Sequence, residues 1–149
     1  MDYHIAEGVG TNLSISNKHA REILAYIKGL NVDKAIQRLE RVIEHKDSVP
    51  FKRFNTKIGH RPGKGPGRYP EKACNEIIIV LRNAKNNAIN KGLQEEKLVI
   101  KEGITMMDIS KRRRQRSRKG GYVGSMKLTS VKVKLIEHEE EKPKKKVSK

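Results

Sequence analysis

Three segments of the chain place apolar residues at helical spacing, so the sequence predicts three helices. The first begins after Ser14 or Ser16, either of which can cap a helix, and ends before Gly29. The second begins after Asn31, and the third covers residues 70–92. The third is the longest and most apolar, so we expect it to be central. The apolar stripes are Ala20, Ile23, Leu24 and Ile27; Val32, Ala35, Ile36, Leu39, Val42 and Ile43; and Ala73, Cys74, Ile77, Ile78, Leu81, Ala84 and Ala88.

The link between the first two predicted helices is very short, because only residues 29–31 separate them. Two short amphipathic helices joined in this way commonly lie antiparallel. We therefore expect them to pack against each other as an αα-hairpin.

After Gly92 the apolar period changes from the helical value to two, which indicates β-strands. The alternating apolar positions are Leu98, Ile100, Ile104 and Met106, and then Val131, Val133 and Leu135. An arginine-rich apex with glycines separates the two segments, so the pattern predicts a long antiparallel hairpin. At about 3.3 Å per residue, an arm of residues 103–130 would reach roughly 40 Å. The outer half of this arm should stand free of the small core.

The first 13 residues favour at most one short strand, and two further segments carry no regular period. Residues 50–70 hold four prolines and four glycines, so they form neither a helix nor a long strand. A loop of this length is usually functional or disordered. Residues 138–149 are rich in lysine and glutamate, and we expect them to be a disordered charged tail after a single domain of residues 1–137.

The charge of the chain limits its function. The 149 residues include 34 Lys and Arg against 17 Asp and Glu, which gives a formal net charge of +17. A protein this basic needs either an unusually salty solvent or a polyanionic partner, which could be a nucleic acid or an anionic membrane surface. Hydrophobic residues make up only 35% of the chain, so the core is small. Cys74 is the single cysteine and excludes an intrachain disulfide, and we expect a cytoplasmic protein.

The strongest basic signal is the run of residues 111–119, where seven of nine residues are basic. Such a strand cannot be buried in apolar protein, but it can be buried in nucleic acid, where arginine binds phosphates and stacks on bases. Glycines after the run would let the apex bend or let phosphates approach the backbone. The alternative is a solvated loop or a nuclear localisation signal. The basic residues are Lys111, Arg112, Arg113, Arg114, Arg116, Arg118 and Lys119, and the glycines are Gly120, Gly121 and Gly124.

The loop of residues 50–70 is a second candidate for RNA contact, because its basic residues alternate with aromatic ones. Phe51 and Phe54 could equally anchor the loop to the core or touch bases. The basic candidates are Lys52, Arg53, Lys57, His60, Arg61, Lys64 and Arg68.

No catalytic or metal-binding pattern emerges from the sequence. The glycines around Lys64 lack the spacing of a phosphate-binding loop and the Ser or Thr that follows its lysine. The five histidines lack metal-ligand spacing and are expected at the surface or at RNA. Cys74 lies on the apolar side of its helix, where a small core residue is expected. The sequence therefore indicates no enzyme and no cofactor.

Four motifs together resemble the universal large-subunit ribosomal protein twenty-two family, in its archaeal and eukaryotic form. The similarity covers roughly residues 10–137 and rests on residues 10–22 (GTNLSISNKHARE), 49–55 (VPFKRFN), 65–70 (GPGRYP) and 83–88 (NAKNNA). The arm departs from the family pattern, because family members commonly carry a Pro-Arg-Ala motif where this chain reads Ser110-Lys111-Arg112.

The resemblance implies an α+β fold in which three helices pack on a small three-stranded antiparallel sheet with a long protruding β-hairpin. It implies a structural constituent of the large ribosomal subunit that binds rRNA, supports subunit assembly and helps line the nascent-peptide exit tunnel. The expected partners are large-subunit rRNA, neighbouring ribosomal proteins and, near the hairpin tip, the nascent peptide. Lys18 and Arg21 of the first motif join the rRNA-binding candidates. Lys127 joins them as well, because Lys127-Leu128-Thr129-Ser130 resembles the family pattern at the end of the arm.

Two alternatives from other classes remain open. A DNA-compacting chromosomal protein would share the positive charge but would not need one long basic arm. A membrane-surface protein is disfavoured because the basic run has no apolar face at helical spacing.

Overall fold

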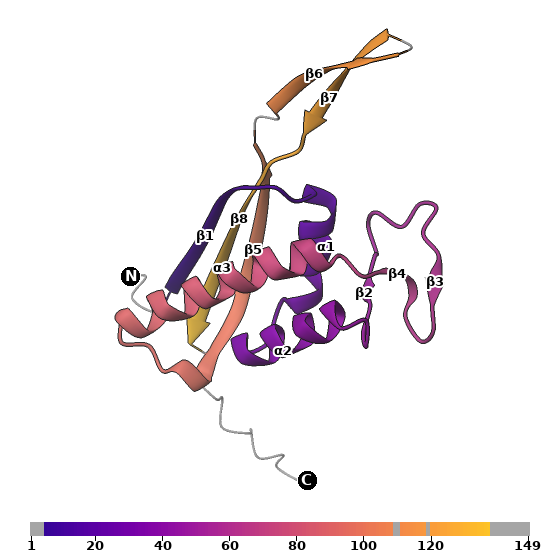
Figure 1. The fold of residues 1–149 in the computed structure, drawn as a ribbon. Helices are drawn as coiled ribbons and strands as arrows, with labels where there is room; N and C mark the ends of the chain where they lie inside the picture. The colour runs from indigo at the N-terminus through magenta and orange to yellow at the C-terminus, as the bar shows by residue number, and fades with distance from the viewer. Residues whose placement is uncertain (1–4, 109–110, 119, 138–149) are drawn as a thin grey trace.

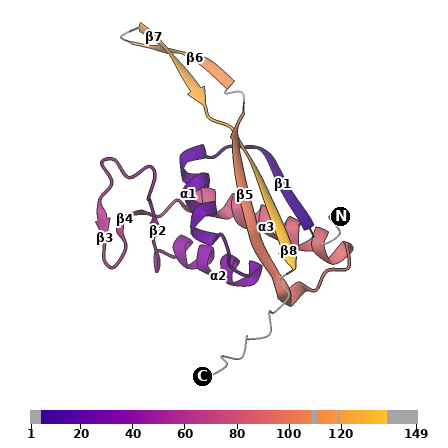
Figure 2. The ribbon, with the colours of Figure 1, turned by 180° about the vertical axis from the view of Figure 1, so that it is seen from behind.

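The computed structural model describes residues 5–108, 111–118 and 120–137, and it shows an α+β fold, as expected. A three-stranded antiparallel sheet has the strand order β1-β8-β5, and helices cover one face of it (Figure 1). Figure 2 shows the opposite face of the sheet, which is not covered by any helix of the residues that the structure describes. The main elements are β1 (Ile5–Leu13), α1 (Asn17–Ile27), α2 (Val32–Ile43), α3 (Glu71–Asn90), the short 3-10 helix η1 (Glu95–Lys97), β5 (Leu98–Met107) and β8 (Thr129–Glu137).

The helix boundaries follow the predicted caps. Ser16 is the N-cap of α1 by position, but its side chain makes no capping hydrogen bond. The Asn31 side chain does cap α2, because it accepts a hydrogen bond of 3.0 Å from the Asp33 amide. Gly29 and Gly92 take φ angles of 79° and 77°, which glycine adopts at low cost after a helix end. Pro70 lies directly before α3.

The expected αα-hairpin is wrong, because α1 packs mainly against β5 and α2 mainly against α3. The link between α1 and α2 explains the difference. The Gly29 amide donates to the Ile100 carbonyl, and the Ile100 amide donates to the Leu30 carbonyl. Residues 29–31 therefore make hydrogen bonds with backbone groups on the outer edge of β5. From there α1 runs along β5, and α2 packs against α3.

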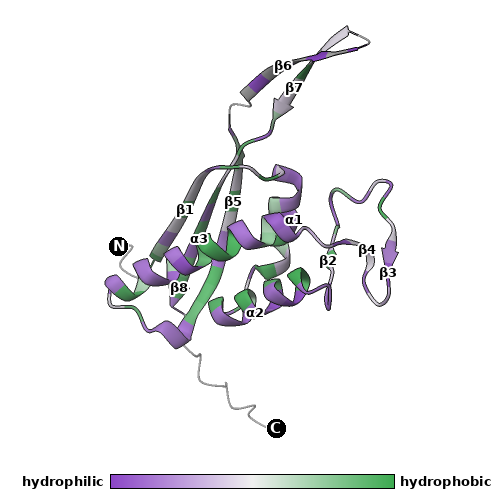
Figure 3. Ribbon diagram, viewed as in Figure 1, coloured by the Kyte–Doolittle hydropathy of each residue, from purple (hydrophilic) through white to green (hydrophobic). Residues whose placement is uncertain are grey.

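The core lies between the sheet and α3, and β8 is the central strand. Val131, Val133 and Leu135 of β8 are fully buried, and every residue of the predicted α3 stripe is buried. In Figure 3 the part of β5 beside the helices is green, whereas the helices alternate between green and purple. Cys74 is a buried core residue, as predicted, and burial raises the pKa of its thiol to about 12.

One prediction about β5 is wrong: Ile104 and Met106 do not share the buried face of Leu98 and Ile100. Ile104 is 36% exposed and Met106 is 60% exposed. The pairing with β8 shifts register between Ile100 and Glu102, so one extra residue enters β5 as a bulge. Because strand side chains alternate, this single insertion moves Ile104 and Met106 to the outer face.

The inverted register places Gly103 of β5 beneath α1, and Gly8 of β1 lies beneath α3. A Cβ atom added to Gly103 would lie 2.8 Å from Cδ2 of Leu24 on α1. A Cβ added to Gly8 on β1 would lie 2.6 Å from the Ala84 Cβ and 2.7 Å from the Val80 carbonyl oxygen on α3. The helices therefore approach the sheet closely only because these positions carry no side chain.

The arm continues from β5 and β8 as a second antiparallel ladder, β6 (Lys111–Ser117) with β7 (Gly120–Met126), and it projects away from the helices (Figure 1). The predicted hairpin is confirmed, but it is interrupted at its root. There the Asp108 carboxylate accepts hydrogen bonds from the Ser130 hydroxyl at 2.7 Å and from the backbone amide of Asn12 at 3.3 Å. The Asp108 amide also donates to the Leu128 carbonyl. This network joins β1, β5 and β8 where the arm leaves the core.

Residues 50–70 form a structured loop that contains no helix. Its short strands, in the order β2-β4-β3, are β2 (Val49–Pro50), β3 (His60–Arg61) and β4 (Gly65–Arg68). Glu22 of α1, only 3% exposed, fixes the start of the loop. Its carboxylate accepts hydrogen bonds from three consecutive loop amides, those of Lys52, Arg53 and Phe54, at 2.8 to 3.1 Å. The predicted charged tail of residues 138–149 lies outside the described residues.

We predict that Gly8→Ala destabilises the fold by about 1–3 kcal/mol, because the new methyl group meets the backbone of α3, which cannot rotate away. Chemical denaturation of the free protein measures this change. Gly59→Ala is the matched control, because a Cβ at Gly59 meets nothing within 4 Å. Equal stability of the two variants would contradict the close contact between β1 and α3.

We predict that Glu22→Gln costs about 1–3 kcal/mol in unfolding free energy, because an amide group cannot accept all three buried N–H bonds. The same denaturation assay measures this cost. Glu96→Gln, at an exposed position, should change stability by less than about 0.5 kcal/mol. Cleavage within residues 52–58 under limited proteolysis should also rise in Glu22→Gln alone, and an unchanged cleavage rate would contradict the anchoring role.

Candidate nucleic-acid interface

The outer arm presents a row of arginines on one face. Arg112, Arg114 and Arg116 occupy alternate positions of β6, and all three are exposed. Alternate residues of a strand lie on the same face, about 6.7 Å apart along it. Their partners on β7 are Ser125, Val123 and Gly121. The arginine face therefore stands beside a strand of mostly small side chains.

A hollow of about 560 Å³ lies beside the tip and is lined by Arg114, Arg116, Gly120 and Gly121. The two glycines leave the floor of this hollow without side chains. A phosphate or a base could thus approach the backbone between two guanidinium groups, which bind phosphates and stack on bases. Of the other predicted basic residues, Arg118 is exposed in the turn, Lys111 and Arg113 occupy intervening positions of β6, and Lys119 lies outside the described residues.

The loop of residues 50–70 forms a second basic surface. Its cationic side chains are exposed, with one exception, and the Arg61 guanidinium lies 5.1 Å from the centroid of the Tyr69 ring. This contact holds one cation in place at low entropic cost before any ligand binds. The exposed candidates are Lys52, Arg53, Lys57, His60, Arg61 and Arg68.

Lys64 is the exception, because its ammonium group is held inside the loop. It forms an ion pair with Asp47 and hydrogen bonds with the Tyr26 hydroxyl at 3.3 Å and the Ser48 carbonyl at 3.2 Å. Burial alone would lower the pKa of Lys64, but the bonds to Asp47 and Tyr26 raise it. The geometry favours a role for Lys64 in tying the loop to α1 and to the segment after α2.

The sequence left open whether Phe51 and Phe54 anchor the loop to the core or touch bases, and the structure gives the two residues different surroundings. Phe51 is only 3% exposed and belongs to the core, where the His19 ring meets it edge-on at 5.5 Å. Phe54 is partly exposed, with the Lys18 ammonium 5.4 Å and the Arg53 guanidinium 5.8 Å from its ring centroid. Phe51 therefore anchors the loop, and Phe54 remains within reach of a ligand.

The start of α1 and the root of the arm complete this surface. Lys18, Arg21 and Lys127 are all exposed, and Lys18 meets the loop at Phe54. His19 is half-buried, although the sequence suggested only a surface or RNA-contacting residue. Burial, and then the charges of Arg68 and Lys127, lower the pKa of His19. The sequence did not show that His19 packs against Phe51 of the loop. Its place beside Lys18 was the available signal.

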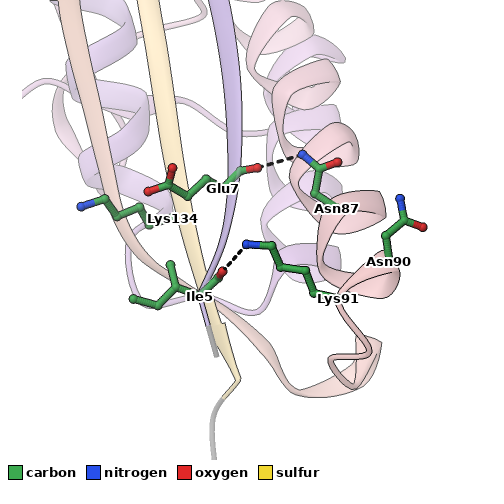
Figure 4. A pocket seen from close by; sticks show the side chains of 6 residues that line it. All are labelled: Ile5, Glu7, Asn87, Asn90, Lys91 and Lys134. Carbon is green, nitrogen blue, oxygen red and sulfur yellow. Dashed lines mark hydrogen bonds between the residues drawn. The ribbon is translucent and has the colours of Figure 1, made fainter. Parts of the chain in front are cut away.

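A larger hollow of about 670 Å³ lies between the end of α3 and β1 (Figure 4). Asn87 of α3 donates to the Glu7 carbonyl, and Lys91, directly after α3, donates to the Ile5 carbonyl, each at 2.9 Å. These carbonyls lie on the free edge of β1, so the side chains close a sheet edge that could otherwise pair with another chain. The neighbouring cation Lys134 pairs with Glu102 at 3.3 Å. The chemistry of this hollow thus serves the fold.

Two further findings concern only the residues that the structure describes. Within residues 5–108, 111–118 and 120–137, no group of three or more His, Cys, Asp or Glu side chains is placed to hold a metal ion. In the same part of the chain, no helix is both long and apolar enough to cross a membrane.

Comparisons with known proteins agree with this architecture. The family described as ribosomal protein L22p/L17e matches residues 8–136. Large ribosomal subunit protein uL22 of Methanococcus aeolicus is 50% identical over 99 residues, which cover 64% of this chain and 65% of that protein. The uL22 proteins of two other organisms are 48% identical over 109 residues (Methanocaldococcus jannaschii) and 50% identical over 88 residues (Cenarchaeum symbiosum).

The matched segments span 65%, 70% and 58% of the lengths of these three relatives, and 64%, 68% and 58% of this chain. The family match is broader, because it includes all three helices, the loop, the arm and all of the sheet except residues 5–7 of β1 and Glu137 of β8. The resemblance that the sequence motifs suggested is confirmed: the chain belongs to the ribosomal protein L22p/L17e family.

Proposed function

We propose that this chain is a structural, non-catalytic constituent of the large ribosomal subunit that binds rRNA through its arm and its basic loop. The observation that carries the proposal is the row of exposed arginines on β6, held beyond the core on paired strands. Such a row repels itself unless polyanions surround it. The relatives named uL22 are large-subunit proteins, which supports the same assignment.

In this proposal the rRNA contacts come from three places. The arm supplies the run of residues 111–119, and the loop supplies its exposed cations and His60. The start of α1 supplies Lys18 and Arg21, and the root of the arm supplies Lys127. Lys64 contributes indirectly by holding the loop in shape. Residues 1–137 act as one domain, and the lysine-rich residues 138–149 are a charged appendage.

The arm also suggests what the protein does in the particle. Because the arm projects from a packed core, it can pass between rRNA segments that the core itself cannot reach (Figure 1). Holding several segments together would support assembly of the subunit in the cytoplasm. We place the glycine-floored tip at the nascent-peptide exit tunnel, with neighbouring ribosomal proteins at the core.

A DNA-compacting protein is the alternative with a different partner, since its affinity would rest on charge alone. The phosphate backbone of any duplex would satisfy such a protein. The arm argues for RNA, because a narrow arm with a bare tip suits entry between folded strands better than contact along a continuous duplex. The alternative predicts equal binding to DNA and RNA.

We predict that the triple variant Arg112→Gln, Arg114→Gln, Arg116→Gln binds a large-subunit rRNA fragment more weakly and with a smaller salt dependence. Each lost phosphate contact releases about one counterion fewer, so the slope of log K against log salt should fall by roughly 2 to 3. Fluorescence anisotropy at several salt concentrations measures both quantities.

The matched control removes three positive charges elsewhere, through Lys28→Gln, Lys34→Gln and Lys97→Gln at exposed positions. This control should retain most of the wild-type slope. Equal slopes for the two triple variants would contradict the role of the arm. Equal affinity of the wild-type protein for duplex DNA and for the rRNA fragment at physiological salt would favour the DNA-compacting alternative.

A further inference from the structure

A smaller cavity of about 250 Å³ lies where the start of α1 meets the first half of the loop. Sites for drug-sized ligands usually enclose roughly 300–1,000 Å³, so this volume suits a smaller flat group. Its lining combines aromatic, cationic and small polar side chains: Ser16, Lys18, His19, Phe51, Arg53, Phe54, Thr56, Ile58 and Arg68.

The walls of the cavity offer ring surfaces. Phe51 is fixed in the core, and His19 meets it at an interplanar angle of 87°, so these two rings form a rigid corner. Phe54 is partly exposed between Lys18 and Arg53. Stacking on such rings is a common way for proteins to hold an unpaired base, because every base has a π-face.

The charges at the cavity favour an anion. Three of the lining residues, Lys18, Arg53 and Arg68, are cationic, and no Asp or Glu is among the lining residues. The nearby Glu22 carboxylate is buried and already accepts three backbone N–H bonds. A phosphate at the rim would therefore meet positive charge without a competing carboxylate.

His19 adds a hydrogen-bonding group that carries no charge. Its lowered pKa keeps the imidazole neutral near pH 7, so one ring nitrogen can donate a hydrogen bond and the other can accept one. The root of the arm adjoins the start of α1, because the Thr129 hydroxyl donates to the Ile15 carbonyl at 3.0 Å. The cavity thus lies between the two basic surfaces, at a point where RNA bound to both would pass.

We infer that this cavity holds a single unstacked nucleotide of RNA, with its base against the rings of Phe54 and His19 and its phosphate at Lys18, Arg53 and Arg68. The inference rests on the proposed function, since it requires a bound RNA. It goes further by assigning stacking, and not only charge, to one defined place on the protein.

Phe54→Leu tests the stacking contact in the full-length protein, because leucine keeps the apolar contact with the core but lacks a ring. We expect the affinity for the large-subunit rRNA fragment to fall by roughly 5- to 150-fold, as for the loss of one stacked base. The salt slope should not change. Arg53→Gln should instead lower the slope by about 1.

Ile43→Ala is the control, because Ile43 is also partly buried against the core but lies on α2, outside the cavity lining and outside both basic surfaces. It should leave the affinity within about twofold of wild type. Thermal unfolding of each variant checks that the loop and core remain folded. A second measurement avoids substitution: ultraviolet crosslinking of the wild-type complex, followed by mass spectrometry, should place a nucleotide adduct on His19 or Phe54.

The inference is overturned if Phe54→Leu and Ile43→Ala bind the rRNA fragment equally and no adduct forms at the cavity, while the arginine row still contributes its salt slope. It is also overturned if an acidic peptide, and not a free nucleotide, displaces a fluorescent nucleotide that is bound to the wild-type protein. Failure of the wild-type protein to prefer rRNA over DNA would instead reject the proposed function.

Discussion

The pairing of β5 with β8 is the interaction on which the rest of the structure depends. Beneath the helices, β8 supplies the fully buried side chains of Val131, Val133 and Leu135, and hydrogen bonds to β1 and β5 hold the strand on both sides. The same two strands lead into the arm, which continues as β6 and β7. Because the sheet of the core and the arm share the paired strands β5 and β8, packing of the core also fixes where the basic arm emerges.

Repulsion between cations is the opposing constraint, and the structure meets it by distributing them. Two of the cations pair with carboxylates on the outer face of the sheet, Lys132 with Glu7 and Lys134 with Glu102. Lys64 is neutralised inside the loop. The arginines of the arm and the exposed cations of the loop are set apart at two places beyond the main core, where a polyanion can reach them (Figure 1).

Local patterns in the sequence were sufficient to predict the three helices, their caps and the arm, because periodicity and capping residues act within a few positions. The docking of α1 and α2 was not predictable, since it depends on backbone groups at the distant Ile100. The bulge in β5 was hidden because Ile104 and Met106 continue an apolar alternation. The candidate site was predicted as two basic segments, but the junction at His19 and Phe54 required tertiary contacts.

The most direct test of the central claim, that a packed core mounts a basic arm inside folded rRNA, is electron cryo-microscopy of large subunits purified through a tag on this chain. The account predicts the chain in the particle, with its core fold as described and the guanidinium groups of β6 within hydrogen-bonding distance of rRNA phosphates or bases. Large subunits that lack the chain, or an arm that lies in solvent away from rRNA, would contradict it.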